Sequence, residues 1–298
     1  MADQNFLNPV ELANTFVSVG EKKACLPIGK MFLLAILAGI YIGFGAHLAT
    51  TVSTGDYAFG IKKLLAGAVF SVGLMLVVIP GAELFTGNNL MTVALCHGRI
   101  RFGGLFRNWA VVYTGNLVGS VFLAIIIAAG TGLLSGAVGG TAINIAAGKV
   151  SDTPIGHLNP TLAFFLRGIA CNMLVCLAVM MAIAAKDIAG KVLGIFFPIM
   201  AFVASGFEHS IANMYFIPAG IFAKNFPAAV EASGKTAEQL SGINWVSMWT
   251  NNLIAVTAGN IVGGAIFVGV VYFFAHVRQS APAGARQNAD DKATSDAR

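Results

Sequence analysis

The feature that most constrains this chain is a long apolar run with two ionisable side chains at its centre. Residues 192–223 contain no lysine or arginine, and the run is bounded by Lys191 and Lys224. About 20 apolar residues suffice to cross a bilayer as one helix. Yet Glu208 and His209 interrupt the run, and an ionisable group at bilayer depth costs at least about 2.5 kcal/mol. Such residues need a functional or structural reason.

The composition places the whole chain in a membrane. Of the 298 residues, 57% are hydrophobic and only 10% are charged, whereas soluble domains have about 25% charged residues. The net charge of +5 forms no basic stripe interleaved with aromatics, so nothing favours nucleic-acid binding. The start of the chain lacks the pattern of a cleaved signal peptide. The four cysteines show no zinc or disulfide spacing and are interpreted as free structural thiols, so no metal or other cofactor is predicted.

Hydropathy predicts an all-α integral membrane protein with six spans. They are residues 31–52, 64–97, 105–134, 160–185, 192–223 and 246–277. We therefore expect an N-terminal cytoplasmic segment (1–30), a channel-forming membrane domain (31–277) and a disordered cytoplasmic tail (278–298).

An even number of spans puts both termini on one side of the membrane. Cytoplasmic loops carry an excess of lysine and arginine. With the N-terminus inside, the cytoplasmic cations are Lys22, Lys23, Lys30, Arg99, Arg101, Arg107, Lys186, Lys191 and Arg278, and the outer ones are Lys62, Lys63, Lys149, Arg167, Lys224 and Lys235. The excess favours an orientation with both termini in the cytoplasm.

The two halves of the chain repeat each other. Residues 81–88 and 206–213 both read G-x-E-x-x-x-x-N, with Glu83 matching Glu208. Downstream, Asn108 precedes Gly-Asn at 115–116 by the same spacing as Asn252 precedes Gly-Asn at 259–260. Each half holds three spans, so the halves must cross the membrane in opposite orientations. The glycine-rich stretch between residues 134 and 160, which contains Lys149, Asp152 and Pro154, is interpreted as the connection between them.

The repeated motifs interrupt spans two and five, span two at residues 80–83 and again at residues 87–89, and this predicts a substrate path. Broken helices at matching places of inverted repeats free backbone groups that must be satisfied by protein or by a cavity. The N-termini of the half-helices carry partial positive charge and favour an anion. The residues expected near this path are Glu83, Thr86, Asn88, Glu208, His209 and Asn213.

Each of these polar residues has a second interpretation. His209 is read as a pore-lining group that contacts or protonates an anion, against a neutral histidine hydrogen-bonded within the bundle or a metal ligand. For Glu83 and Glu208 a structural brace is favoured over transport chemistry. Asn116 and Asn260 either brace the breaks or face the pore. Thr86 either hydrogen-bonds a carboxylate or His209, or caps the helix break.

Three apolar residues lie close to the breaks: Phe70, Leu74 and Phe202. Such residues are usually core or lipid-facing. A ring of them can instead close a pore to ions by dewetting.

The longest motifs resemble the formate/nitrite transporter family. They are Phe70-Ser71-Val72-Gly73-Leu74, Gly81-Ala82-Glu83-Leu84-Phe85-Thr86, residues 171–178 (CNMLVCLA) and residues 204–214 (ASGFEHSIANM). The resemblance extends from about residue 31 to 277. It implies an aquaporin-like protomer with broken spans two and five, assembled as a homopentamer in the cytoplasmic (inner) membrane of a prokaryote, with no enzymatic activity.

The resemblance also implies roles for individual residues. Phe70, Leu74 and Phe202 would form the hydrophobic constrictions, His209 would be the central histidine and Thr86 its neighbour. Asn172 would face the pore, and Lys149 would draw anions toward the outer mouth.

The expected substrate is a small monovalent anion of a weak acid, with formate favoured and nitrite or hydrosulfide as alternatives. We expect transport coupled to protons through His209, because a neutral acid crosses an apolar region at lower cost than a bare charge. Two classes of membrane protein are the alternatives. A water or glycerol channel would carry paired Asn-Pro-Ala motifs, and only Asn159-Pro160-Thr161 is present. A membrane-embedded enzyme would need a nucleophile or metal constellation that the sequence does not show.

Overall fold

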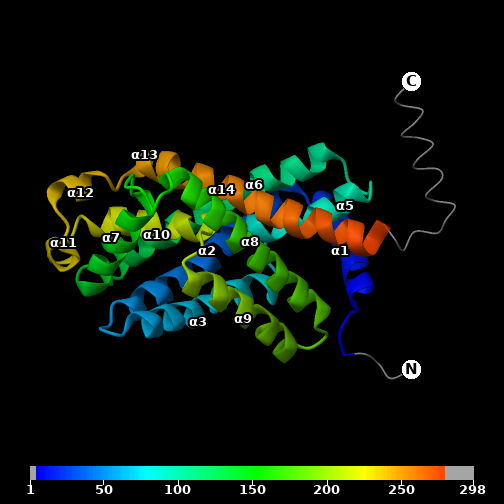
Figure 1. Cartoon of the computed structure of the whole chain (residues 1–298), viewed down its shortest axis with the longest axis horizontal. Helices are drawn as coiled ribbons and strands as arrows, with labels where there is room; N and C mark the ends of the chain where they lie inside the picture. The colour runs from blue at the N-terminus through cyan, green and yellow to red at the C-terminus, as the bar shows by residue number, and fades with distance from the viewer. Residues whose placement is uncertain (1–4, 279–298) are drawn as a thin grey trace.

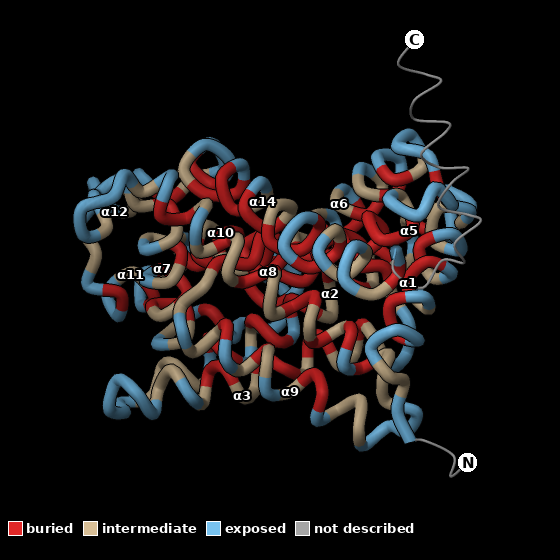
Figure 2. The backbone as a smooth tube through the Cα atoms, turned by 45° about the vertical axis from the view of Figure 1, so that its right-hand side comes forward, coloured by how far each residue is buried: buried red, intermediate tan, exposed pale blue. Residues whose placement is uncertain are grey.

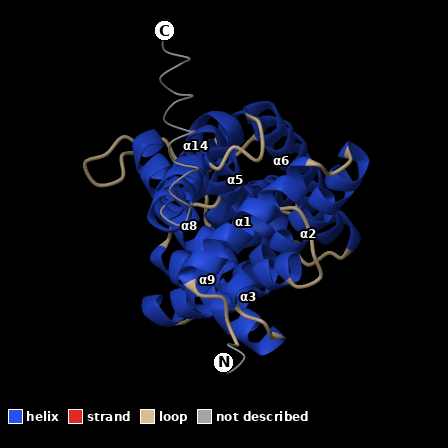
Figure 3. Cartoon of the chain, turned by 90° about the vertical axis from the view of Figure 1, so that its right-hand side faces the viewer, coloured by secondary structure: helices blue, strands red, loops and turns tan. Residues whose placement is uncertain are grey.

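Helices make up the described part of the chain, residues 5–278 of the computed structural model (Figure 3). Helices long and apolar enough to cross a membrane are Ile28–Ser53, Phe59–Val78, Phe102–Gly130, Pro160–Ala184, Ile188–Ser205 and Trp245–Val277. They confirm the six predicted spans. Apart from Arg278, the tail predicted to be disordered lies outside the described residues.

The element bounds follow the order of the chain. They are α1 (Pro9–Ala24), α2 (Ile28–Ser53), α3 (Phe59–Val78), α4 (Phe85–Asn88), the 3₁₀ turn η1 (Asn89–Met91), α5 (Thr92–Cys96), α6 (Phe102–Ile125) continued by the π-helical η2 (Ile126–Gly130), α7 (Ala137–Val150), α8 (Pro160–Ala184), α9 (Ile188–Ser205), α10 (Ser210–Ala223), α11 (Pro227–Ser233), α12 (Ala237–Ser241), α13 (Trp245–Ser247), η3 (Met248–Leu253), α14 (Ile254–Ile261), η4 (Val262–Val270) and η5 (Phe273–Val277).

Spans two and five are broken, as predicted. In span five, α9 ends at Ser205 and is followed by its C-cap residue Gly206, whose φ of 76° is the left-handed conformation that glycine adopts without strain. The second half-helix, α10, begins at Ser210. In span two, α3 ends at Val78, the chain turns at Gly81 with φ 91°, and α4 begins at Phe85. Here one detail of the prediction was wrong. The second expected interruption, at residues 87–89, is a tightening from α4 into the 3₁₀ turn η1, and the chain stays helical.

A further correction concerns the connection between the repeats and the N-terminal segment. Residues 137–150, predicted as part of a loop, form α7, and α1 lies within the segment 1–30, where no helix was predicted. Each repeat therefore starts with an extra short helix before its three spans. Glycine content misled the prediction for α7, because Gly139 and Gly140 serve close packing: a Cβ added at Gly139 would lie 1.9 Å from the Leu134 carbonyl oxygen.

Small residues hold the spans together. A Cβ at Gly119 of α6 would lie 2.0 Å from the Ile36 carbonyl oxygen of α2, and one at Gly263 would lie 2.2 Å from that of Ile169 in α8. These are matching positions of the two repeats. Close backbone approach through glycine is the usual way membrane helices pack, since lipid offers no hydrophobic drive between them.

Burial is greatest in the middle of the molecule. Figure 2 shows the buried segments running through the middle of the molecule, with the exposed ones at its ends and outer faces. In Figure 1, α1 and the last described residues lie at one end of the long axis, and α11 and α12 lie at the other. The two described ends of the chain are thus at the same end of the molecule, as an even number of spans requires.

Candidate functional site

His209 is the N-cap residue of α10. Its Nδ1 atom accepts a hydrogen bond from the backbone N–H of Ala212 (3.0 Å), and its Nε2 atom lies 2.9 Å from the Thr86 hydroxyl. A nitrogen that accepts a hydrogen bond carries no proton. The neutral ring must therefore hold its proton on Nε2, where it points to Thr86 and the centre of the molecule. Only 3% of His209 is exposed, so this donor is removed from bulk water.

Two side-chain amides hydrogen-bond the backbone of Thr86. Its carbonyl oxygen accepts hydrogen bonds from Asn172 Nδ2 (3.2 Å) and Asn89 Nδ2 (3.2 Å). Asn172 Nδ2 also donates to the carbonyl oxygen of Asn260 (2.7 Å). Three of the predicted residues, Thr86, Asn172 and His209, thus form one buried polar group. Asn89 was missed because its amide, three residues after Thr86, resembles an ordinary helix-capping group.

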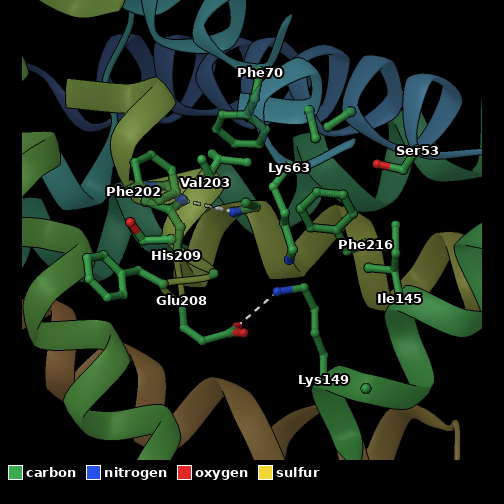
Figure 4. Close-up of a pocket in the computed structure, with 18 of the residues that line it drawn as sticks. Ser53, Lys63, Phe70, Ile145, Lys149, Phe202, Val203, Glu208, His209 and Phe216 are labelled. Atoms are coloured by element: carbon green, nitrogen blue, oxygen red, sulfur yellow. Dashed lines mark hydrogen bonds and ion pairs between the residues drawn. The ribbon is translucent and has the colours of Figure 1, made fainter. Parts of the chain in front are cut away.

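The predicted apolar residues enclose His209. The rings of Phe70 and Phe202 meet edge to face with centroids 5.6 Å apart, and Phe202 stacks on the His209 ring at 5.8 Å. Phe70, Leu74 and Phe202 are each at most 3% exposed. Figure 4 shows Phe70, Phe202 and His209 gathered at one end of a cavity.

A cavity lies on each side of this apolar zone. The Lys149 vestibule, about 810 Å³, is lined by Phe70, Phe202, Glu208 and His209 among others. The Lys23 vestibule, about 410 Å³, is lined on the opposite side by Leu74, Glu83 and Asn88 among others. Phe70 and Phe202 therefore close one vestibule and Leu74 the other, while His209 is reached from the Lys149 vestibule.

Matching asparagines brace the two breaks. Asn116 Oδ1 accepts from the backbone N–H of Phe85 (2.9 Å), and Asn260 Oδ1 accepts from that of Ser210 (2.9 Å). The amides of the same two asparagines donate to the carbonyl oxygens of Glu83 and Glu208, both at 2.9 Å. These bonds satisfy the backbone groups that each break frees. Of the alternatives left open, this geometry is that of braces, because every hydrogen bond of the two side chains goes to the backbone.

The carboxylates of Glu208 and Glu83 each contact one lysine and one asparagine side chain. Lys149 Nζ lies 2.9 Å from Glu208 Oε2, which also accepts from Asn213 (2.6 Å). In the other repeat Lys23 Nζ lies 2.6 Å from Glu83 Oε1, and Asn88 donates to Oε2 (2.7 Å). Figure 4 shows the Lys149–Glu208 pair at the wall of its vestibule.

Lys23 was missed as the counterpart of Lys149. The two lysines occupy the ends of α1 and α7, and their carbonyl oxygens accept from Asn108 (3.4 Å) and Asn252 (2.9 Å) respectively. The repeat motif was visible around the breaks, but the sequences of α1 and α7 share too little for the match to be seen. Within residues 5–278, no group of three or more histidine, cysteine or acidic side chains could hold a metal ion.

Comparison with known proteins decides the family. The model of the formate/nitrite transporter family matches residues 10–274. The chain belongs to this family. It is 45% identical to the probable formate transporter of Methanothermobacter thermautotrophicus, over 92% of this chain and 99% of the relative. It is 38% identical to the formate channel FocA of Escherichia coli strain K12, over 94% and 98% of the two chains.

Solved structures agree with this membership. A pentameric formate channel with formate bound is 41% identical and superposes with a TM-score of 0.73, covering 84% of this chain and 98% of that one. A second, described as an FNT family ion channel, is 32% identical with the same TM-score and covers 89% and 98%. The protein is therefore a multi-pass membrane transporter or channel of the formate/nitrite transporter family, and not an enzyme.

Proposed function

We propose that this member of the formate/nitrite transporter family carries formate together with a proton, by way of His209. The observation that supports it most is the hydrogen-bonding of the ring. Nδ1 accepts from the Ala212 N–H, so the imidazole carries its proton on Nε2, as a donor shared with the Thr86 hydroxyl inside an apolar zone. A carboxylate arriving from the Lys149 vestibule would meet this donor beside Phe70 and Phe202.

The steps follow from charge and hydration. The ammonium of Lys149, paired with Glu208, draws the anion into the vestibule and lowers the cost of bringing it there. At the phenylalanines the anion loses water, and the cost of burying its charge rises steeply. Formate takes up a proton from the vestibule water, becomes formic acid with Nε2–H as its hydrogen-bond donor, and passes Leu74 as a neutral molecule. It releases the proton in the water of the Lys23 vestibule.

Substrate choice and assembly belong to the same proposal. Formate is favoured because relatives along nearly the whole chain are named for it, and nitrite or hydrosulfide is the alternative substrate. A homopentamer is proposed from the similar channel described as pentameric. We place the protein in the cytoplasmic membrane of a prokaryote with both termini inside. The rival neutral-solute channel would not need lysines in both vestibules.

The test replaces His209 by asparagine. The shorter amide can still accept from the Ala212 N–H and cap α10, but it cannot place a donor where Nε2 lies. In liposomes containing a pH dye, we expect formate uptake with co-transported protons to fall about 10- to 100-fold, the effect of losing a hydrogen bond worth about 1.5–3 kcal/mol.

The matched control is Leu84→Asn at the equivalent position of the other repeat, where no side chain caps α4. It should keep more flux than His209→Asn. Unchanged proton-coupled flux in His209→Asn would contradict the role of His209, and swelling of liposomes in glycerol would favour the neutral-solute channel.

A further inference from the structure

The two vestibules are built on the same pattern, yet they differ in one cation. The Lys149 vestibule is lined by Lys62, Lys63, Lys149 and Arg167 with Glu208. The Lys23 vestibule is lined by Lys23, Lys30, Lys191 and Glu83. The first therefore holds the more positive lining, and it is the one that contains an arginine.

Arg167 stands where the other repeat has leucine. The carbonyl oxygen of Arg167 accepts from the backbone N–H of Glu208 (3.3 Å), and that of Leu34 accepts from the N–H of Glu83 (3.3 Å). Arg167 and Leu34 each line the vestibule of their own repeat. The structural task at this position is performed by the backbone, and leucine suffices for it, so the fold does not require the guanidinium.

Within residues 5–278, nothing neutralises the guanidinium of Arg167. Lys149 and Asn213 already occupy Glu208 Oε2. Among residues 5–278 no carboxylate lies within ion-pair distance of Arg167, and its side chain makes no hydrogen bond to them. By contrast Arg107, on α6, donates to the carbonyl oxygen of Leu26 at 3.3 Å. A half-buried arginine in a membrane span that has no partner in the described part of the chain is a candidate ligand-binding group.

We propose that Arg167 selects planar oxyanions, those with two oxygen atoms on one central atom, at the entrance to the pathway. A guanidinium presents two parallel N–H groups that match such a pair of oxygens, whereas a lysine ammonium acts as a point charge. Formate and nitrite have this shape and hydrosulfide does not. Lys149 attracts any anion, while Arg167 favours the bent oxyanions before they reach His209. This inference rests on the proposed function.

The experiment compares three anions in one preparation. Wild type, Arg167→Lys and Arg167→Leu are reconstituted in liposomes, and uptake of sodium formate, sodium nitrite and sodium hydrosulfide is measured by stopped flow at one pH and at low anion concentration. The uptake rate of each variant is divided by the wild-type rate for the same anion. This ratio cancels the effect of the different acidities of the three parent acids. Elution as the wild-type oligomer in detergent shows that the variants fold.

For Arg167→Lys we expect formate and nitrite uptake to fall about 3- to 10-fold more than hydrosulfide uptake. Lysine keeps the positive charge but lacks the two parallel N–H groups of the guanidinium. Arg167→Leu should show the same bias with a general loss added. The control Lys62→Leu removes a cation of the same vestibule and should lower all three anions by a similar factor.

Two results would overturn the inference while leaving the proposed function intact: equal ratios for the three anions in Arg167→Lys, or uptake unchanged in both Arg167 variants. If wild type carries none of the anions, the proposed function fails and the selectivity of Arg167 fails with it.

Discussion

Individual residues give this symmetric fold its chemical direction. His209 and Leu84 occupy the N-cap position of the second half-helix in their repeats, with nearly the same φ of −112° and −109°, but only the His209 side chain makes a capping hydrogen bond. Asn172 lies four residues after Gly168, and Gly39 lies four after the matching Ala35. The second repeat therefore places an imidazole and an amide where the first has apolar groups, so the polar centre is reached from one vestibule.

Lys149 supplies the first prediction at this scale. Lys149→Met should lower anion uptake and also lower the unfolding temperature, because it leaves the carboxylate of Glu208, only 7% exposed, without a counter-charge. Breaking a buried pair costs about 3–5 kcal/mol. In the double variant with Glu208→Gln, the unfolding temperature should recover while uptake stays low. Recovery of uptake in the double variant would show that Lys149 serves structure alone.

Asn260 supplies the second. Asn260→Leu removes bonds to the N–H of Ser210 and to the carbonyl oxygens of Glu208 and Gly168. Each buried group left unpaired costs about 1–3 kcal/mol, so we expect a loss of at least about 3 kcal/mol in stability, measured by thermal unfolding in detergent.

The control for this change is Asn251→Leu in the same span. That side chain is partly exposed: its amide donates to the Val150 carbonyl oxygen (3.0 Å), and its Oδ1 accepts a solvent-exposed hydrogen bond from the Thr250 hydroxyl (2.8 Å), so the loss should be about 1 kcal/mol. Equal effects at the two positions would mean that Asn260 is no brace.

At the scale of elements, the breaks and the close-packed helices depend on each other. The breaks free backbone groups that only a neighbouring span can satisfy, and Asn116 and Asn260 reach them because glycines let that span approach. Gly115 and Gly259 each lie one residue before an asparagine. A Cβ added at Gly115 would lie 2.5 Å from the Ala35 Cβ, and one added at Gly259 would lie 2.1 Å from the Phe165 carbonyl oxygen.

This dependence predicts a position-specific effect of alanine in α6. Gly119→Ala should prevent the α2–α6 contact, since its Cβ would lie 2.0 Å from the Ile36 carbonyl oxygen, and we expect loss of folded protein on size exclusion. Gly103→Ala in the same helix meets nothing within 4 Å and should be tolerated or slightly stabilising. Wild-type yield of Gly119→Ala would contradict the packing argument.

For the whole molecule, the central expectation is its orientation. Cys25 and Cys96 are exposed, and Glu238 is exposed at the opposite end of the molecule on α12. With both termini inside, an impermeant maleimide should label Glu238→Cys in spheroplasts and leave Cys25 and Cys96 unlabelled. Inside-out vesicles should give the reverse, and labelling of Cys25 from outside would invert the proposed direction.

The fold and the centre of the site could be read from the chain to a large extent. Six apolar spans, the duplicated motif and the interrupted helices are local patterns of hydropathy and spacing, and they sufficed to place His209, Thr86 and the glutamates near one path. The asymmetry of His209 against Leu84 was visible for the same reason.

Tertiary structure alone decided which side chains meet. Lys23 contacts Glu83 across 60 positions of sequence, and Arg167 lines a vestibule whose counterpart is lined by Leu34. The Lys23 contact does not follow from periodicity, because the end of α1 is set by packing and not by a repeated motif. The place of Arg167 does not follow either, because only the packing of α8 decides which vestibule the residue lines. The sequence by itself determined a two-fold membrane bundle with one polar centre. Packing determined which cations face the entrance, since a charge near a span becomes a pore residue only through the helix that faces it.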